Sequence, residues 1–174
     1  MLDEHQVRAT FFHCGLNVER LPEIAREVAT RGHEIGNHSH SHPRFYLRSG
    51  RFLYEELARA QEAIHGATGR RPVLFRAPQG TRWPGLAEAQ SRLGLLGVMW
   101  TVLGRDWALP AEGIVRRLIR GARNGAILCL HDGYEVRPRP DVRPMLEAVR
   151  RVIPELQARG FCLETVSELL CPRN

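Results

Sequence analysis

Short apolar runs alternate with longer amphipathic segments along almost the whole chain of 174 residues. The apolar runs are continuous rather than alternating, which is typical of strands in a parallel sheet that is covered on both faces. They predict six strands, at residues 9–15, 33–38, 73–78, 96–102, 126–132 and 161–166.

The segments between these runs repeat their apolar residues at helical spacing. In residues 18–32, for example, Leu21, Ile24 and Val28 share one face, and Gly32 ends the pattern. Further helices are predicted at residues 51–69, 85–94, 111–122 and 141–160. Strands that alternate with helices indicate right-handed β-α-β units, and hence an α/β sheet or barrel. No linker or repeat interrupts the pattern, so residues 1–174 are expected to form one domain.

The charge of the chain invites a nucleic-acid interpretation, because the net charge is +6 and every basic residue is arginine. Nucleic-acid sites concentrate basic residues on one face, often beside aromatic side chains. Here the arginines are scattered, and the nearest cluster, residues 137–143, is interrupted by prolines and an aspartate. We therefore expect no nucleic-acid partner.

Cysteine usage and hydropathy place further bounds on the chain. Three of the four cysteines lie inside apolar runs, and none forms a C-x-x-C pair, so buried free thiols are expected. No stretch has the apolar length of a membrane span, and the first ten residues do not resemble a signal peptide. The chain as written is therefore expected to be soluble and cytoplasmic, although its compartment and oligomeric state stay open. The cysteines are Cys14, Cys129, Cys162 and Cys171.

Chemically reactive side chains follow four of the six predicted strands. Function in α/β folds gathers at the carboxyl ends of the strands, so these side chains are expected to share one rim. They are His38 with His42, Arg76, Asp106 with Trp107, and His131 with Asp132.

The densest of these groups is GNHSHSHP, residues 36–43. On a helical turn, His38 and His42 would face the same way and could hold one cation, a spacing that zinc sites use. His40 would project elsewhere, either to hydrogen-bond to a metal ligand without itself binding the metal, or to face solvent. A turn of polar histidines that merely closes a strand is the alternative.

The motifs together resemble those of the polysaccharide deacetylases with a NodB homology domain, carbohydrate esterase family 4. ATFF, HEIGNHSHSHP, FRAPQG, RDW and LCLHDG occur in that family's order and spacing, from about Thr10 to Leu170. The resemblance implies a distorted (β/α) barrel with a divalent metal, commonly zinc, at its rim. It also implies hydrolysis of N-acetyl, or possibly O-acetyl, groups on carbohydrates.

The resemblance also assigns roles in the proposed hydrolysis. His38 and His42 match the two metal-ligand histidines, and Ser39 matches a supporting hydroxyl. A bound metal would polarise the acetyl carbonyl and acidify the attacking water. His131 matches the general acid that protonates the departing sugar amine, and Asp106 matches the aspartate that orients it.

The remaining assignments concern the substrate. Arg76 matches the arginine that positions the catalytic base, although an ordinary rim ion pair is the alternative. Trp107 and Leu130 resemble the apolar pair that lines the acetyl-methyl pocket, although core packing is equally compatible with the pattern. Gln79 replaces the aromatic residue of the arginine motif; its backbone N–H could still hold the oxyanion, while sugar preference would change.

One family motif has no counterpart in these residues. Members begin with a strand that ends in Thr-Phe-Asp-Asp, which supplies the general base and the third metal ligand. Asp3 and Glu4 cannot replace it, because they lie in a segment that corresponds to the tail of the first helix. The chain as given is therefore expected to be inactive or severely impaired, with weakened metal binding.

Two explanations stay open. The sequence could begin inside a longer chain, which is favoured because removing the first strand of a barrel leaves unpaired strand edges. Alternatively, it could be a shortened homologue that binds sugar or metal without hydrolysis. A metallohydrolase of another small amide is a further possibility, and the glycan and the native metal stay undecided.

Overall fold

The computed structural model describes residues 1–133 and 140–171 and divides the chain into two compact units. The four-strand unit is Ala9–Met99, and the two-strand unit combines Met1–Arg8 with Trp100–Asn174. The prediction of a single domain stays a prediction. None of the helices within the described residues has the length and apolar character needed to cross a membrane.

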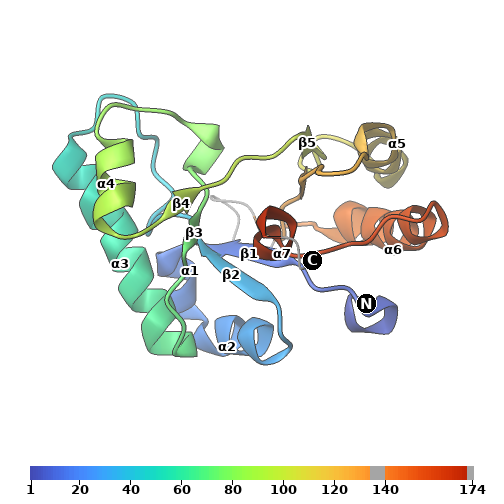
Figure 1. Ribbon diagram of the computed structural model, residues 1–174, viewed down its shortest axis with the longest axis horizontal. Helices are drawn as coiled ribbons and strands as arrows, with labels where there is room; N and C mark the ends of the chain where they lie inside the picture. The colour runs from blue at the N-terminus through green and yellow to red at the C-terminus, as the bar shows by residue number, and fades with distance from the viewer. Residues whose placement is uncertain (134–139, 172–174) are drawn as a thin grey trace. The chain divides into compact units, whose positions relative to one another are not determined.

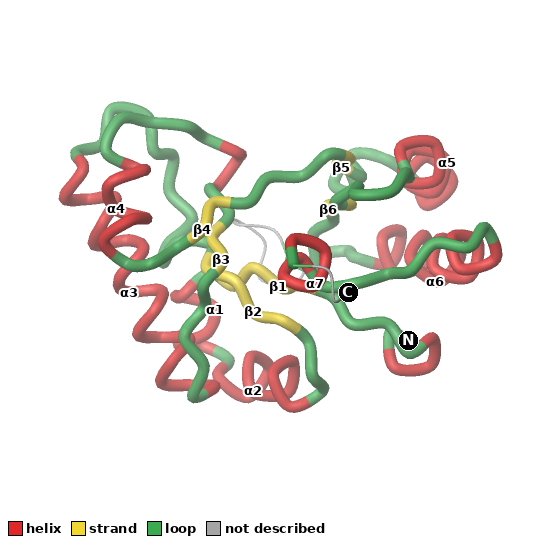
Figure 2. The backbone as a smooth tube through the Cα atoms, viewed as in Figure 1, coloured by secondary structure: helices red, strands yellow, loops and turns green. Residues whose placement is uncertain are grey.

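The four-strand unit is built on a parallel sheet in the order β1-β2-β3-β4. Figures 1 and 2 show these strands side by side, with α3 and α4 lying along one side of them. The register pairs Thr10 with Glu34 and His13 with Asn37, so β1 and β2 end level with each other. The elements are β1 (Thr10–His13), α1 (Gly15–Arg20), α2 (Pro22–Thr30), β2 (Glu34–Asn37), α3 (Gly50–Thr68), β3 (Leu74–Phe75), the 3-10 turn η2 (Pro78–Gly80), α4 (Leu86–Arg92) and β4 (Leu96–Gly97).

The longest helix of this unit, α3, has clear sequence signals at both ends. Ser49 caps its start by accepting a hydrogen bond from the backbone N–H of Phe52. Gly69 ends it in a left-handed conformation, with φ 71°, which glycine adopts without steric cost. Its inward face contributes Leu53 and Leu57 to a core with Phe75, which places the helix directly behind the sheet.

The two-strand unit carries a parallel pair, β5 and β6, in which Val102 lies opposite Leu128. Helices α5 and α6 pack against each other, and their shared core includes Ile114 and Ala148, both fully buried. The elements are the 3-10 turn η1 (Asp3–His5), β5 (Val102–Leu103), α5 (Ala111–Gly121), β6 (Leu128–Cys129), α6 (Arg143–Ala158) and α7 (Val166–Leu170). Parallel strands that alternate with helices in both units confirm the predicted α/β class.

Two strand predictions were wrong. Residues 96–102 form two short strands instead of one, because the ladder changes partner: Val98 N–H donates to Phe75, whereas Thr101 N–H donates to Ile127. Residues 161–166 form no strand. There Thr165 and Glu168 make a capping box that starts α7, a Thr-x-x-Glu signal that the apolar run obscured.

The first predicted helix was also wrong in its detail. It breaks at Leu21 into α1 and α2, because a residue before proline disfavours helical backbone. The buried face then runs through Ala25 and Ala29, while Leu21 and Ile24 are 48% and 53% exposed.

Two smaller predictions concern the cysteines and the location of Asp3. None of the four cysteines forms a disulfide, and Cys129 is buried, but Cys162 is exposed despite its apolar neighbours. Asp3 lies in the 3-10 turn η1 rather than in the tail of an α-helix. Of the arginine cluster at residues 137–143, residues 137–139 lie outside the described part of the chain.

Candidate active site

Residues 38–42, the histidine turn, continue directly from the end of β2. The backbone N–H of His38 still donates to His13 of β1, at 2.9 Å, so the turn begins where the sheet stops. Ser39 and His42 then adopt left-handed backbone, with φ of 62° and 54°. Non-glycine residues rarely do so, and such strain persists only where the surroundings enforce it.

The imidazoles of His38 and His42 lie together, with ring centroids 4.8 Å apart and the rings edge to face. Nδ1 of His38 lies 2.6 Å from the carbonyl oxygen of Arg76. A carbonyl can only accept, so Nδ1 carries the proton, and in the neutral ring Nε2 is the nitrogen without one. Metal-binding histidines are held in this way, through the nitrogen that does not bind the metal.

His40 points away from this pair and into the protein, where it is 2% exposed. Its Nε2 lies 3.0 Å from a carboxylate oxygen of Glu19 on α1. Two positions were predicted for His40, and the one that faces solvent is therefore wrong.

The residues present fit part of a metal centre. His38 and His42 supply two imidazoles at one place, but the described residues, 1–133 and 140–171, contain no group of three His, Cys, Asp or Glu side chains that could hold an ion. A catalytic zinc site normally has three protein ligands. The described residues thus supply two histidines and not a complete ligand set.

Arg76 and Gln79 leave β3 beside the histidine turn, since Arg76 provides the carbonyl that holds His38. The Arg76 side chain is buried, donates to the carbonyls of Val98 and Met99, and lies 4.1 Å from the centre of the Phe12 ring. Gln79 is exposed and left-handed, with φ 53°. The arginine is therefore enclosed, and the glutamine side chain reaches solvent.

In the two-strand unit, Asp106 and His131 form a close pair. Asp106 follows β5 and His131 follows β6, and parallel strands bring their carboxyl ends to one edge. The fully buried Asp106 carboxylate accepts from the backbone N–H of His131 at 2.7 Å and from its Nδ1 at 3.0 Å. The ring is thus held in one orientation, with Nδ1 protonated and Nε2 left for a substrate.

The predicted apolar pair flanks this histidine. Trp107 is 50% exposed, and its ring centroid lies 5.2 Å from that of His131, edge to face. Leu130 is partly buried and packs over Gly104, where an added Cβ would come within 2.4 Å of the leucine. The pocket-lining role of these two residues stays a prediction.

Sequence reasoning missed three polar residues that hold the histidine turn. Asn37 is fully buried and accepts from Ser39 N–H at 2.9 Å, while its amide donates to Gln61 on α3. Glu56, also on α3, accepts from the turn as well. The signal was present, because Glu56 and Gln61 fall on the face of α3 that otherwise buries Leu53 and Leu57.

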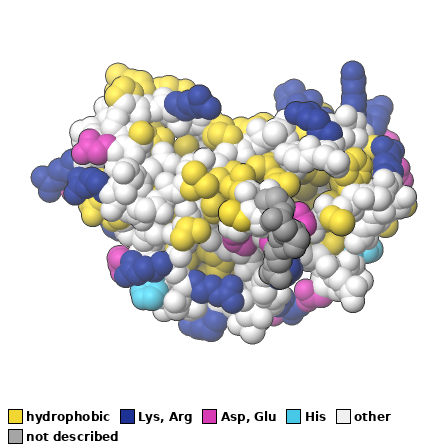
Figure 3. Space-filling model, viewed as in Figure 1, with side chains coloured by type: hydrophobic (Ala, Val, Ile, Leu, Met, Phe, Trp, Pro, Cys, Tyr) yellow, Lys and Arg dark blue, Asp and Glu magenta, His cyan; other side chains and the backbone are white. Residues whose placement is uncertain are grey.

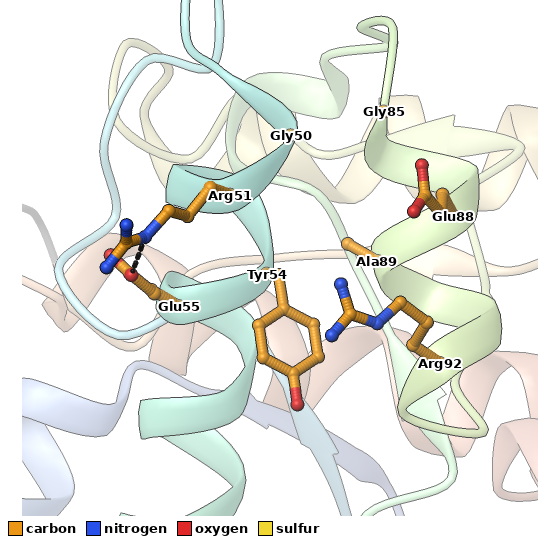
Figure 4. Close-up of a pocket in the computed structure, with 8 residues that line it drawn as sticks. All are labelled: Gly50, Arg51, Tyr54, Glu55, Gly85, Glu88, Ala89 and Arg92. Atoms are coloured by element: carbon orange, nitrogen blue, oxygen red, sulfur yellow. Dashed lines mark hydrogen bonds and ion pairs between the residues drawn. The ribbon is translucent and has the colours of Figure 1, made fainter.

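A hollow of about 500 Å³ lies between α3 and α4 (Figure 4). Arg92 lies over the Tyr54 ring at 4.1 Å, and Arg51 pairs with Glu55 at 2.8 Å. Both arginines of the hollow therefore already interact with other residues that line it. None of the predicted site residues lines it.

Comparison with known proteins assigns the chain to a family. The sequence pattern of the family described as polysaccharide deacetylase matches residues 1–98. A chitooligosaccharide deacetylase of Azorhizobium caulinodans is 37% identical over 94% of this chain and 82% of its own length. The chain belongs to the polysaccharide deacetylase family. A peptidoglycan-N-acetylglucosamine deacetylase of Bacillus cereus is also similar, at 32% identity over 98% of this chain and 78% of that protein.

Solved structures of carbohydrate esterase family 4 share the fold of this chain. An acetyl xylan esterase of Clostridium thermocellum, solved with a cobalt ion, matches with a TM-score of 0.85 and 32% identity, over 98% of this chain and 80% of that one. A family 4 pseudoenzyme of Bacillus anthracis matches at 0.88 and 26%, over 97% of this chain. The chain spans 57% of that structure's length. These likenesses confirm the predicted (β/α) fold, and the family includes metal-bound and pseudoenzyme members.

Proposed function

We propose that this chain is a hydrolase of the deacetylase type, which removes N-acetyl groups from an amino-sugar polymer. The bond cleaved is the carbon–nitrogen bond of an acetamido group and not a peptide bond. The observation that carries this proposal is the imidazole pair of His38 and His42, oriented through the Arg76 carbonyl. The similarity to deacetylases of chitooligosaccharide and of peptidoglycan N-acetylglucosamine supports the choice of substrate.

The histidine turn would supply the electrophilic part of the reaction. His38 and His42 would hold a divalent ion, which we propose to be zinc, and such an ion would supply Lewis-acid polarisation of the acetyl carbonyl. The chain's own contribution is to hold the His38 ring through Nδ1, so that Nε2 would be the nitrogen that binds the ion. Gln79 is exposed and would contact a sugar bound here, and its backbone N–H is the proposed oxyanion donor.

The Asp106–His131 pair would supply the proton. Water would add to the acetyl carbon and give up its proton to the general base, which the Thr-Phe-Asp-Asp motif supplies in the family and which has no counterpart among these residues. As the carbon–nitrogen bond breaks, the electron pair would stay on nitrogen, which would take a proton from His131 Nε2. The products are acetate and the free amine. Asp106 keeps the ring in the required orientation and stabilises its cationic form. Trp107 and Leu130 would receive the acetyl methyl group, and Arg76 would position the catalytic base.

A second candidate is a module that binds acetylated sugar without hydrolysis. Two observations favour it. The described residues hold no third ligand beside His38 and His42, and the fold is similar to that of a family 4 pseudoenzyme. A mutant of that pseudoenzyme has been solved with restored enzymatic activity, so loss and recovery of hydrolysis occur within this fold.

Mass spectrometry of N-acetylglucosamine oligomers would separate the two candidates. The chain as given would be compared with a chimaera that carries the amino-terminal segment of the Azorhizobium caulinodans relative before Met1. We expect the chimaera, loaded with zinc, to release acetate and the chain alone to be much slower. His131→Gln in the chimaera should abolish release while sugar binding persists. A chimaera that binds oligomers but never releases acetate would support the binding module instead.

A further inference from the structure

Glu56 is a buried carboxylate that takes no part in the proposed chemistry. It lies on the inward face of α3, is 6% exposed, and its neighbours on that face, Leu53, Leu57 and Ala60, are apolar. Burying a charged carboxylate is costly unless hydrogen bonds replace its lost hydration. The position of its hydrogen-bond donors therefore indicates what this residue is for.

The donors to Glu56 that the structure gives all belong to the histidine turn. Oε2 accepts from the backbone N–H of His40 at 3.1 Å and from that of Ser41 at 2.8 Å. Oε1 accepts from the Ser41 hydroxyl at 3.0 Å. A single side chain of α3 thus holds two successive residues in the middle of the turn.

The turn needs such a hold because its backbone is strained on both sides of this point. Ser39 precedes the anchored residues and His42 follows them, and both are left-handed. The hydroxyl of Ser39 accepts from His42 N–H at 3.2 Å, which closes the turn. Unless the middle of the turn is fixed, these residues would relax toward ordinary backbone, and the two ligand rings would separate.

We propose that Glu56 is a positioning residue that sets the separation and orientation of the His38 and His42 imidazoles, and through them the affinity for a divalent cation. The metal part of this inference rests on the proposed function; the ring geometry does not. The same helix supports the turn a second time through Asn37, whose amide donates to the Leu57 carbonyl at 2.9 Å. Helix α3 is therefore the scaffold against which the histidine turn is set.

Three substitutions test the role of Glu56. Glu56→Gln preserves shape: its amide oxygen can accept both backbone N–H groups, and its amide can donate to the Ser41 hydroxyl. Glu56→Ala removes every acceptor. Glu55→Gln is the matched control, because Glu55 is the neighbouring residue on α3 but lies at the surface in an ion pair with Arg51.

Two readouts are needed. In metal-free protein, nuclear Overhauser effects between the His38 and His42 rings should persist in Glu55→Gln and Glu56→Gln and disappear in Glu56→Ala. Calorimetric titration with Co²⁺ should then show a 10- to 100-fold loss of affinity in Glu56→Ala, as is typical when the support of a metal ligand is removed. The loss should stay within about threefold in the other two variants, since the hydrogen bonds to the turn survive.

A folded Glu56→Ala protein with unchanged ring contacts would overturn the proposal. If Glu56→Ala does not fold, Glu56→Asp takes its place: it keeps the charge but is one methylene shorter, so the ring contacts should weaken, and unchanged contacts would again overturn the proposal. Wild-type protein that binds neither Co²⁺ nor Zn²⁺ would count against the proposed metal function, while the ring contacts would still decide the role of Glu56.

Discussion

At the residue scale, Asp141 offers a direct test of a local electrostatic effect. The Arg143 guanidinium donates to both carboxylate oxygens of Asp141, and the Arg143 backbone N–H adds a third bond, so the pKa of Asp141 falls to about 2. A depressed pKa means that the folded protein favours the ionised carboxylate. The stabilisation is thus present above about pH 3.9, the ordinary aspartate value, and is lost as the pH falls toward 2.

Arg143→Ala should raise the pKa of Asp141 toward its ordinary value, although not fully, because the backbone N–H remains. Carbon-13 titration of the Asp141 carboxyl by NMR measures this directly. Arg150→Ala is the control, since Arg150 is an exposed arginine on the same helix, and it should leave the titration unchanged. An Asp141 midpoint that is identical in wild type and Arg143→Ala would contradict the assignment.

Single residues also show which contacts can be predicted from the sequence. Asp106 and His131 could be expected together, because each ends a parallel strand and such ends share an edge. Glu56 could not be matched to the histidine turn, because its partners are backbone N–H groups, which every residue carries. A lone carboxylate on an apolar helix face indicates that a partner exists, but the sequence does not say where.

At the element scale, α1 and α3 meet so closely that glycine is required between them. A Cβ at Gly15 would lie 2.8 Å from the His40 ring and 2.9 Å from the backbone of Ala60. The N–H groups of Gly15 and Leu16 also donate to the carbonyls of Ser39 and His40, so α1 holds the histidine turn as well as Glu56 does. Helix α1 cannot move away from α3 without pulling on the turn.

Gly15→Ala should therefore lower the free energy of unfolding by about 1–3 kcal/mol, the usual cost of overpacking. Gly66→Ala is the matched control: Gly66 lies within α3, nothing would touch its Cβ within 4 Å, and it should gain about 0.5–1 kcal/mol in helix propensity. Urea unfolding followed by circular dichroism measures both. Equal stability of the two variants would show that α1 has room to shift.

Helices and strands could be predicted where local signals were strong. The predictions failed where contacts with distant parts of the chain determine the structure. Helix α3 has a serine cap and a glycine stop, and its bounds agree with the pattern. The run at residues 96–102 looks like one strand, and nothing local marks the place near Trp100 where its hydrogen bonds pass from Phe75 to Ile127. A change of sheet partner is a property of the folded chain and leaves little trace in hydropathy.

At the scale of the whole molecule, the excess of arginine bears on nucleic-acid binding. On the face drawn in Figure 3 the basic side chains occur singly or in small groups. Many are paired with carboxylates: Arg8 with Glu168, Arg31 with Glu27, Arg51 with Glu55, Arg71 with Glu62, Arg151 with Glu112, and Arg159 with Glu155. Paired and dispersed charges can neutralise few adjacent phosphates, so any association with DNA should release few counterions.

A mobility-shift titration with duplex DNA at increasing salt tests this expectation. Retention at low salt should be weak and independent of sequence, and it should disappear near physiological ionic strength, with a shallow slope of log affinity against log salt. Oligomers of N-acetylglucosamine, which carry no charge, should bind with little salt dependence over the same range. A steep slope for DNA, corresponding to about six or more phosphate contacts, would mean that the arginines do form one binding surface. The protein would then bind nucleic acid as well as the proposed carbohydrate.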